Sequence, residues 1–285
     1  MRKSTTIIII VLAVIVYLIT ATILVSLLTG SKAGIVSFSK GIALIEVEGV
    51  IADSRPVVRQ LKKYSKNPAI AAIVLRVDSP GGGVSASQEI YDEIKRTKEK
   101  GKKIIVSMGA LAASGGYYIS TPADIIVANP GTITGSIGVI MEFPILSDLL
   151  KKLGVKVEVI KSQEHKDIGS PFREMSPKER ALLKDVVTSV YEQFISVVVE
   201  NRKISEAKVR ALADGRILSG AQAREFALVD TLGSLEDAVR IAAGIVGIKG
   251  EPQLWQERKR IRISDWLFGR IFKNLFIPEL KYIIN

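Results

Sequence analysis

Ser114 is the side chain in this sequence that is best placed for nucleophilic chemistry. It lies in residues 112–117, Ala-Ala-Ser-Gly-Gly-Tyr, shortly after a strand-like run at residues 103–108. A serine between small residues at a strand-to-helix turn can expose its hydroxyl and leave backbone N–H groups free beside it. The chain has no Cys and one His. We therefore predict that Ser114 is a nucleophile whose general base is His165 or a less usual group such as a lysine.

A second loop suited to chemistry follows the apolar run at residues 70–77. Its sequence at residues 78–83, Asp-Ser-Pro-Gly-Gly-Gly, lets the backbone approach a ligand and point N–H groups at a phosphate or an oxyanion. A plain tight turn is the alternative. Neither glycine segment has the Gly-Lys-Ser/Thr ending of a phosphate-binding loop or the dinucleotide fingerprint. We therefore expect no nucleotide binding.

These loops need a sheet that brings the ends of several strands together. Five short β-rich runs are predicted strands: residues 42–47, 70–77, 104–108, 125–128 and 155–160. Apolar residues at helical spacing predict helices at residues 85–100 and 144–153. Because strands and helices alternate, we predict one α/β domain with a parallel sheet and its chemistry beyond the carboxyl ends of the strands.

The later part of the chain is predicted to be helical, with well-marked helix starts. Ser176, Pro177 and Glu179 combine an N-cap, a proline at the first helical position and a capping-box glutamate. They begin a long helix that is expected to end at Asn201. Three shorter helices, ending near residues 213, 226 and 246, are expected to be capped by Ser205, Ser219 and Ser234.

Four ordered motifs together resemble the signal peptide peptidase A family, which are serine proteases of the Clp/crotonase superfamily. They lie at residues 78–83, 112–118, 134–138 and 165–171. The resemblance runs from about Gly41 to Gly247. It implies a Clp/crotonase-like α/β fold with a parallel sheet and helices, and the family's short form with a single catalytic domain.

The resemblance also implies the roles of individual residues. The nucleophile falls on Ser114, the general-base lysine on Lys166, and the serine that orients the lysine amine on Ser136. The oxyanion donors would be the backbone N–H of Gly115 and that of a glycine in the first loop. For this second donor both Gly81 and Gly82 remain open.

A lysine can act as a base only when its amine is neutral. A free lysine amine titrates near 10.4, so the base must be desolvated against apolar walls. A carboxylate packed against the amine would oppose this, so we expect the Asp167 side chain to point away, to a backbone cap or a neighbouring chain. Adjacent residues of an extended segment point to opposite faces, so His165 and Lys166 cannot easily both reach Ser114.

The ends of the chain predict contact with a membrane. Residues 7–28 are uncharged and nearly all apolar, and at about 1.5 Å per residue they span a hydrocarbon layer of about 30 Å. A cleaved signal peptide is the alternative to this transmembrane anchor. Charges flanking the span weakly favour an extracytoplasmic catalytic domain of a single-pass cell-membrane protein.

The basic segment at residues 258–273 mixes cations with apolar and aromatic residues. This mixture is typical of a helix at an anionic membrane surface, and a tail docked on a neighbouring subunit is the alternative. The net charge of the 285-residue chain is +11, yet no nucleic-acid motif accompanies it. We therefore expect membrane and peptide partners and no nucleic acid.

The predicted organisation has four parts. They are an N-terminal membrane anchor at residues 1–30, a linker at 31–40, a Ser/Lys protease domain at 41–247 and a basic amphipathic tail at 248–285. The expected function is cleavage of remnant signal peptides and other unfolded or apolar peptides, without metal or cofactor. The resemblance implies a homo-oligomeric ring, octameric in the family's short forms.

Two other functions are weighed against this one. A crotonase-like acyl-CoA enzyme would share the sheet and the glycine loop but would need neither Ser114 nor an anchor. A catalytically silent membrane scaffold would use the glycine motifs only for subunit contacts. Among the remaining residues, Tyr117 and Tyr118 are expected to pack and Asp78 to cap its turn, while Arg173 and Glu174 could pair within a loop or across subunits.

Overall fold

A computed structural model of the chain describes residues 12–21, 40–257 and 281–283. The chain divides into two units, Met1–Ser39 and Lys40–Asn285. In the first unit residues 12–21 are helical, and the remainder of the predicted anchor at residues 7–28 lies outside the described residues. None of the helices in the described part of the chain is long and apolar enough to cross a membrane. The basic segment at residues 258–273 also lies outside the described residues.

The second unit is built on one sheet whose strands run in the order β7-β6-β4-β2-β1-β9, with β5 between β4 and β8. The central strands are β1 (Gly41–Glu48), β2 (Ile70–Ser79) and β4 (Lys103–Ala113). The remaining strands of this sheet are shorter: β5 (Ile125–Ala128), β6 (Ile133–Gly135), β7 (Ile217–Ser219), β8 (Thr231–Leu232) and β9 (Leu254–Gln256). All pairs are parallel except β6 with β7. The α/β class is therefore confirmed, but the sheet is mixed rather than wholly parallel.

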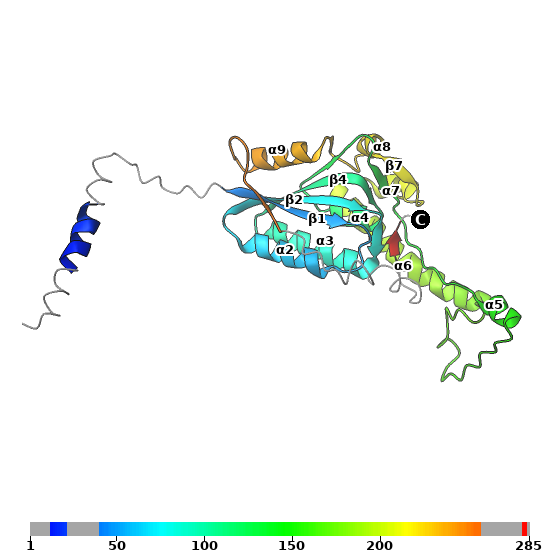
Figure 1. The fold of residues 1–285 in the computed structure, drawn as a ribbon. Helices are drawn as coiled ribbons and strands as arrows, with labels where there is room; N and C mark the ends of the chain where they lie inside the picture. The colour runs from blue at the N-terminus through cyan, green and yellow to red at the C-terminus, as the bar shows by residue number, and fades with distance from the viewer. Residues whose placement is uncertain (1–11, 22–39, 258–280, 284–285) are drawn as a thin grey trace, which may run out of the picture. The chain divides into compact units, whose positions relative to one another are not determined.

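Helices cover both faces of the sheet, as Figure 1 shows. On one face α2 (Arg55–Lys66), α3 (Val84–Glu99), α4 (Gly115–Ser120) and the end of α6 (Pro177–Arg202) enclose the larger apolar core. On the other face α9 (Leu235–Ile245) packs small residues against alternate side chains of β1 and β2. The remaining helices of the unit are α5 (Ser147–Lys152), α7 (Glu206–Leu212) and α8 (Gly220–Glu225). Burial on both faces explains the almost continuous apolar sequence of β2.

The predicted helix starts are largely confirmed. Ser176, Ser219 and Ser234 each accept a backbone N–H in a complete capping box. The helix after Ser205 forms as α7, but without a side-chain cap. The helix predicted at residues 144–153 is shorter, since only Ser147–Lys152 is helical.

The strand predicted at residues 155–160 is wrong. This run has no regular secondary structure, and its side chains are exposed. Val155, Val157 and Val159 alternate with Lys156 and Glu158 as a strand would. A strand also needs a neighbour that supplies backbone hydrogen bonds, and no strand of the described chain lies beside this run.

Two very short strands form a separate two-stranded sheet. Gly81–Gly83 is β3, and Lys281–Ile283 is β10, which pairs with it in antiparallel register. The opposite edge of β3 forms a parallel bridge through Gly82 to Ile51. The glycine loop is therefore an extended strand with a neighbour on each side, rather than a plain tight turn.

Candidate functional site

Three loops meet where β2, β4 and β6 end. Register joins Ser79 of β2 to Ala112 of β4, and Ala112 to Thr134 of β6. The glycine loop, Ser114 and Ser136 each follow within a few residues of these positions. Because parallel strands end at the same edge of a sheet, the structure brings these three predicted elements together.

Ser114 has an unusual backbone conformation. Its φ is 52° and its ψ is −116°, a region that residues other than glycine rarely adopt. The N–H of Ser114 donates to the Gly135 carbonyl oxygen at 2.8 Å, and this bond ties the turn to the end of β6. The residue is 1% exposed, and its Oγ has no hydrogen-bond partner among the described residues. Because the Ser114 hydroxyl has no such partner, it is available to bond a substrate or a general base.

Ser136 matches Ser114 on the neighbouring strand. Ala113 pairs with Gly135 across β4 and β6, so each serine follows a paired residue directly. Ser136 also has positive φ, at 49°, and its N–H donates to the Arg216 carbonyl oxygen at 2.8 Å. It is 7% exposed. Because neighbouring strands lie about 4.8 Å apart, the two serines end side by side.

The glycine loop is fixed by its neighbours. Ser79 Oγ donates to the Gly49 carbonyl oxygen at 2.6 Å and accepts the Gly81 N–H at 3.1 Å. Ile51 N–H donates to Gly81 O at 2.8 Å, and Gly83 N–H donates to Ile51 O at 2.9 Å. Since backbone groups of a strand alternate between its two edges, the N–H of Gly82 faces the edge with which β10 pairs. The Gly81 N–H is already used within the loop.

Glycine is required at two of these positions. A Cβ on Gly82 would overlap the backbone of Ile51, and a Cβ on Gly116 would lie 2.8 Å from the Ser79 carbonyl oxygen. The turn after Ser114 therefore packs directly on the end of β2. The first N–H groups of α4, beginning with Gly115, have no intrahelical acceptor.

Lys166 lies away from these loops along the chain, in a turn between α5 and α6. Its side chain is exposed, and its N–H donates to the Gln163 carbonyl oxygen at 3.2 Å. The described contacts include no hydrogen bond between Lys166 and Ser114 Oγ. The structure therefore does not join the two residues within one chain.

His165 and Asp167 flank Lys166. His165 Nε2 lies 3.7 Å from Glu164 Oε2, whereas Asp167 pairs with Arg173 at 2.8 Å and with Lys161 at 2.6 Å. Hydrogen bonds from Arg173 and then Lys161 hold the pKa of the Asp167 carboxyl far below its usual value. The carboxylate is therefore engaged by cations of its own chain, rather than by a backbone cap or a neighbouring chain as expected.

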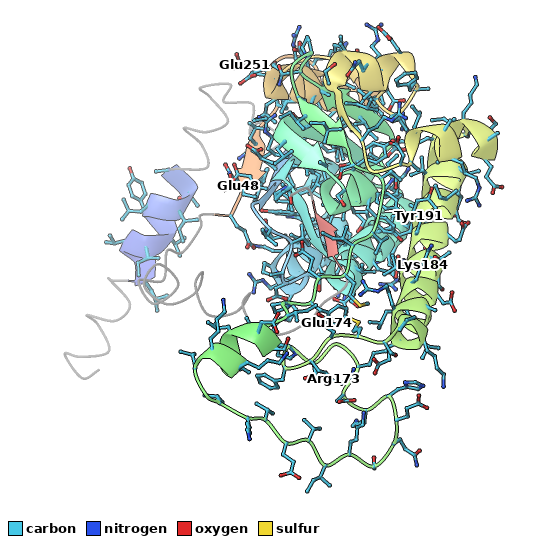
Figure 2. All side chains as sticks on the ribbon, turned by 90° about the vertical axis from the view of Figure 1, so that its right-hand side faces the viewer. Glu48, Arg173, Glu174, Lys184, Tyr191 and Glu251 are labelled. Carbon is cyan, nitrogen blue, oxygen red and sulfur yellow. The ribbon has the colours of Figure 1, made fainter. Side chains whose placement is uncertain are left out.

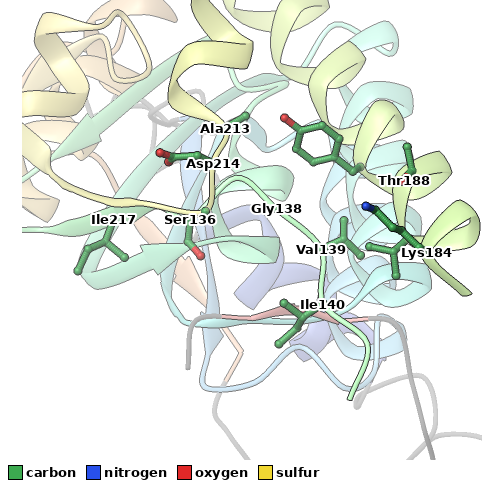
Figure 3. A pocket seen from close by; sticks show the side chains of 12 residues that line it. Ser136, Gly138, Val139, Ile140, Lys184, Thr188, Ala213, Asp214 and Ile217 are labelled. Carbon is green, nitrogen blue, oxygen red and sulfur yellow. The ribbon is translucent and has the colours of Figure 1, made fainter. Parts of the chain in front are cut away.

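One cavity of the described chain is lined by Ser136, and Ser114 is not among its lining residues. It has a volume of about 640 Å³ and lies between α6 and the loops beside β6 and β7 (Figure 3). Its lining includes Ser136, Ile140, Tyr191, Asp214 and Ile217, with Lys184 as its cation. The lining is mainly apolar, with a few polar groups, as in sites that hold apolar side chains.

Of the residues expected to have structural roles, the two tyrosines after Ser114 pack as predicted. Tyr117 and Tyr118 are buried, the Tyr117 hydroxyl donates to the Leu228 carbonyl oxygen at 3.1 Å, and burial raises the pKa of both phenols. Asp78 was expected to cap its own turn; its side chain instead accepts the Leu111 N–H at 3.0 Å, a bond to the neighbouring strand β4. In the described part of the chain no group of three or more His, Asp or Glu side chains could hold a metal ion.

Two features of the site were missed in the sequence. Ser79 holds the glycine loop, and its position directly before Pro80 and the glycines was the available signal. Arg173 bridges Asp167 and Glu179 beside the start of α6. Its partners lie six residues to either side, a spacing that neither helix nor strand periodicity marks.

Comparison with known proteins identifies relatives across most of the second unit. The sequence model of peptidase family S49 matches residues 96–249, and that of Clp protease matches residues 40–128. A Synechocystis sp. protein provisionally named as a protease is 46% identical over 213 residues, which are 74% of this chain and 76% of that protein. A protein of Enterococcus faecium provisionally named signal peptide peptidase SppA is 40% identical over 70% of this chain and 62% of that protein. Protease 4 of Haemophilus influenzae is 36% identical over 72% of this chain, which spans only 35% of that protein.

Proposed function

This chain belongs to peptidase family S49, and we propose that it is a serine endopeptidase whose nucleophile is Ser114. The observation that carries the assignment is the strained, buried Ser114 turn, whose Oγ has no partner in the described chain. Strained residues of this kind cluster at active sites, where the strain serves to pre-organise the reacting group. The glycine loop beside it supplies backbone N–H groups.

Ser114 Oγ would attack the scissile carbonyl carbon while a neutral Lys166 amine accepts the hydroxyl proton. The proton would then pass to the leaving amine as the peptide C–N bond breaks, and water would hydrolyse the acyl-enzyme by the same route. Ser136 would orient the lysine amine, since it ends the strand next to Ser114. We propose the N–H groups of Gly82 and Gly115 as oxyanion donors, because the Gly81 N–H is engaged by Ser79.

The substrate would bind as an added strand. β10 pairs in antiparallel register with the edge of Gly81–Gly83 that faces away from Ile51, so this edge is able to accept an extended peptide backbone. Recognition by strand addition uses main-chain hydrogen bonds for affinity and side-chain pockets for specificity. An extended peptide fits this edge as a substrate, whereas an acyl-CoA thioester would have no use for it. The apolar cavity beside Ser136 is a candidate pocket for an apolar side chain.

We propose that Lys166 reaches Ser114 of a second copy in a homo-oligomeric ring. Lys166 is exposed, and the first half of α6 has no buried apolar residue. Leu182 and Val186 on this half are exposed, as are Ile145 and Leu149 beside it. A second copy that covers this apolar surface would also desolvate the Lys166 amine, which a lysine base requires.

The proposed location is a cell membrane, with residues 7–28 as a single-pass anchor and the catalytic unit outside the cytoplasm. In the described part of this segment Leu12, Val14 and Ile15 are each about half exposed, as a lipid-facing helix would be. Such an enzyme would meet apolar peptides at the membrane. Remnant signal peptides are the substrate class that the SppA name of the relative supports.

Subunit mixing tests this function together with its shared site. The inactive variants Ser114→Ala and Lys166→Ala are unfolded together, refolded as mixed oligomers and given an apolar fluorogenic peptide. Mixed oligomers should recover part of the wild-type activity, because one copy provides Ser114 and the other provides Lys166. A mixture that stays inactive contradicts the shared site. Hydrolysis by either variant alone contradicts the dyad.

A labelling experiment separates peptidase from acyl-CoA chemistry. A fluorophosphonate probe should modify Ser114, as identified by peptide mapping, and acyl-CoA thioesters should not be turned over. An unmodified Ser114 in a preparation that converts acyl-CoA would favour the crotonase-like alternative. An intact oligomer that shows neither peptidase nor acyl-CoA activity would favour a silent scaffold.

A further inference from the structure

One arginine joins the Lys166 turn to the long helix α6. The Arg173 guanidinium contacts Asp167 through two bonds of 2.8 Å, Nε to Oδ2 and Nη2 to Oδ1. It contacts Glu179 through Nη1 to Oε2 at 2.8 Å and Nη2 to Oε1 at 2.5 Å. Bidentate arginine–carboxylate pairs fix the relative orientation of the two groups as well as the distance between them. Asp167 directly follows Lys166, and Glu179 is the third residue of α6.

This bridge is more constrained than an ordinary surface ion pair. The Asp167 and Glu179 side chains are 12% and 4% exposed, and that of Arg173 is 35% exposed. Glu179 also accepts the Ser176 N–H at 2.9 Å, and Lys161 Nζ lies 2.6 Å from Asp167 Oδ1. Isolated exposed ion pairs contribute little to stability. A network in which one arginine binds two nearly buried carboxylates instead holds the side chains in one arrangement. Figure 2 shows Arg173 beside the start of α6, with Lys184 and Tyr191 further along that helix.

Apart from this bridge, the Lys166 turn packs through the buried Gly169 against the ring of Phe143, which is not part of α6. The side chains of residues 153–164 are exposed, and the run at 155–160 pairs with no strand of the described chain. After the turn, the Leu146 N–H donates to the Pro171 carbonyl oxygen at 2.7 Å. The other titratable side chains nearby are His165 and Glu164. Glu164 Oε2 lies 3.3 Å from Lys178 Nζ. The link from the turn to α6 therefore depends mainly on Arg173.

We infer that Arg173 is a positioning residue for Lys166, which it serves by anchoring the Lys166 turn to α6 and by neutralising the adjacent Asp167 carboxylate. This inference rests on the proposed function, in which Lys166 is the general base. Without Arg173 the turn would lose its anchor, and Asp167 would be compensated by Lys161 alone. A less compensated carboxylate beside a lysine favours the protonated amine, which cannot accept a proton.

The test compares two arginines that each bridge two carboxylates in the full-length oligomer. Arg173→Gln removes the bridge, and Arg173→Lys keeps the charge without the planar fork. Arg210→Gln is the matched control, because Arg210 also bridges two carboxylates, Glu192 and Glu206, away from the Lys166 turn. The readouts are kcat/KM on a fluorogenic peptide across pH, and the size of the oligomer.

Arg173→Gln should lower kcat/KM by about 100-fold, the effect of a displacement of about 1 Å in a catalytic group. The acid limb of its pH profile should move to higher pH by about one unit, as for a lysine beside an added negative charge. Arg173→Lys should recover part of both changes, and Arg210→Gln should match the wild type. Adding Asp167→Asn to Arg173→Gln should return the acid limb towards its wild-type position, while kcat/KM stays low.

Two outcomes would overturn the inference. One is an Arg173→Gln profile that matches the Arg210→Gln control. The other is a lowered rate with an unmoved acid limb, which indicates a structural role only. Should Arg173→Gln fail to assemble, Arg173→Lys and Asp167→Asn carry the same comparison of rate and acid limb. Hydrolysis that survives Lys166→Ala refutes the proposed function itself, so the two failures are distinct.

Discussion

At the scale of single residues, the site depends on two serines held in a conformation that serines rarely adopt. Ser114 and Ser136 both have positive φ, and they follow paired positions on neighbouring strands. Such conformations cost about 1–3 kcal/mol each and persist only where the surroundings impose them. Backbone hydrogen bonds from both serines, and the contact of Gly116 with Ser79, supply that constraint. The nucleophile is therefore placed by the ends of strands rather than by its own side-chain contacts.

The glycine loop predicts the effect of one added methyl group. Gly82→Ala should lower kcat/KM by about 100-fold, the order of loss on removing one oxyanion donor, because its Cβ would overlap the backbone of Ile51 and displace the strand. Gly131→Ala is the control, since a Cβ there meets open space. Steady-state kinetics of the two variants, with oligomer size measured in parallel, make the comparison. Equal activities would contradict the assigned role of Gly82.

At the scale of elements, the first turn of α6 is held by a titratable group. The hydrogen bond from Arg173, followed by that from the Ser176 N–H, lowers the pKa of Glu179 from 4.5 to about 2. A carboxyl with a lowered folded pKa contributes its full stability above the unfolded value, and that contribution is lost as pH falls through the folded value. The free energy of unfolding in urea should therefore fall between about pH 4.5 and pH 2. In Glu179→Gln this fall should be shallower, and parallel curves would contradict the role of the cap.

The C-terminal strand leads to a second prediction at this scale. β10 occupies the edge of β3 at which the proposed substrate would pair. A chain truncated after residue 280 should therefore have a lower KM for a peptide substrate by about 10-fold, with kcat little changed, because the competing strand is gone. Initial rates over a range of substrate concentrations measure both constants. An unchanged KM would indicate that β10 and the substrate use different edges.

The elements that could be predicted from the sequence are those marked by local rules. The capping box at Ser176, the N-cap serines Ser219 and Ser234, and the apolar run of β2 indicated α6, α8, α9 and the central sheet. The prediction of a strand at residues 155–160 was wrong, because alternation of apolar and charged residues does not supply a strand to pair with. The short strands β6 and β7 were missed, because three-residue strands exist only through pairing.

The same distinction applies to the site. Ser114 and the glycine loop were recognisable from small residues after strand-like runs. The bridge from Arg173 to Asp167 and Glu179 arises from a turn that no periodicity describes. The cavity beside Ser136 draws its lining from α6 and from the loops beside β6 and β7, segments that only the folded chain brings together.

At the scale of the whole molecule, the chain joins an apolar N-terminal segment to a separate unit at Lys40–Asn285. Deletion of residues 1–39 should move the protein from the membrane fraction to the soluble fraction. Hydrolysis of a soluble peptide should persist within a few-fold of the full chain, whereas cleavage of a peptide embedded in vesicles should fall. Fractionation of cells and the two assays test this together. A truncated protein that stays with the membrane would assign attachment to another segment.

The central claim is that Ser114 is the nucleophile of a peptidase, and one comparison tests it most directly. The kcat/KM of Ser114→Ala on an apolar fluorogenic peptide is measured beside that of the wild type, with both confirmed as oligomers of equal size. Loss of a nucleophile that acts as one unit with its base should reduce turnover by at least about 1,000-fold. Unchanged turnover in an intact Ser114→Ala oligomer would contradict the account.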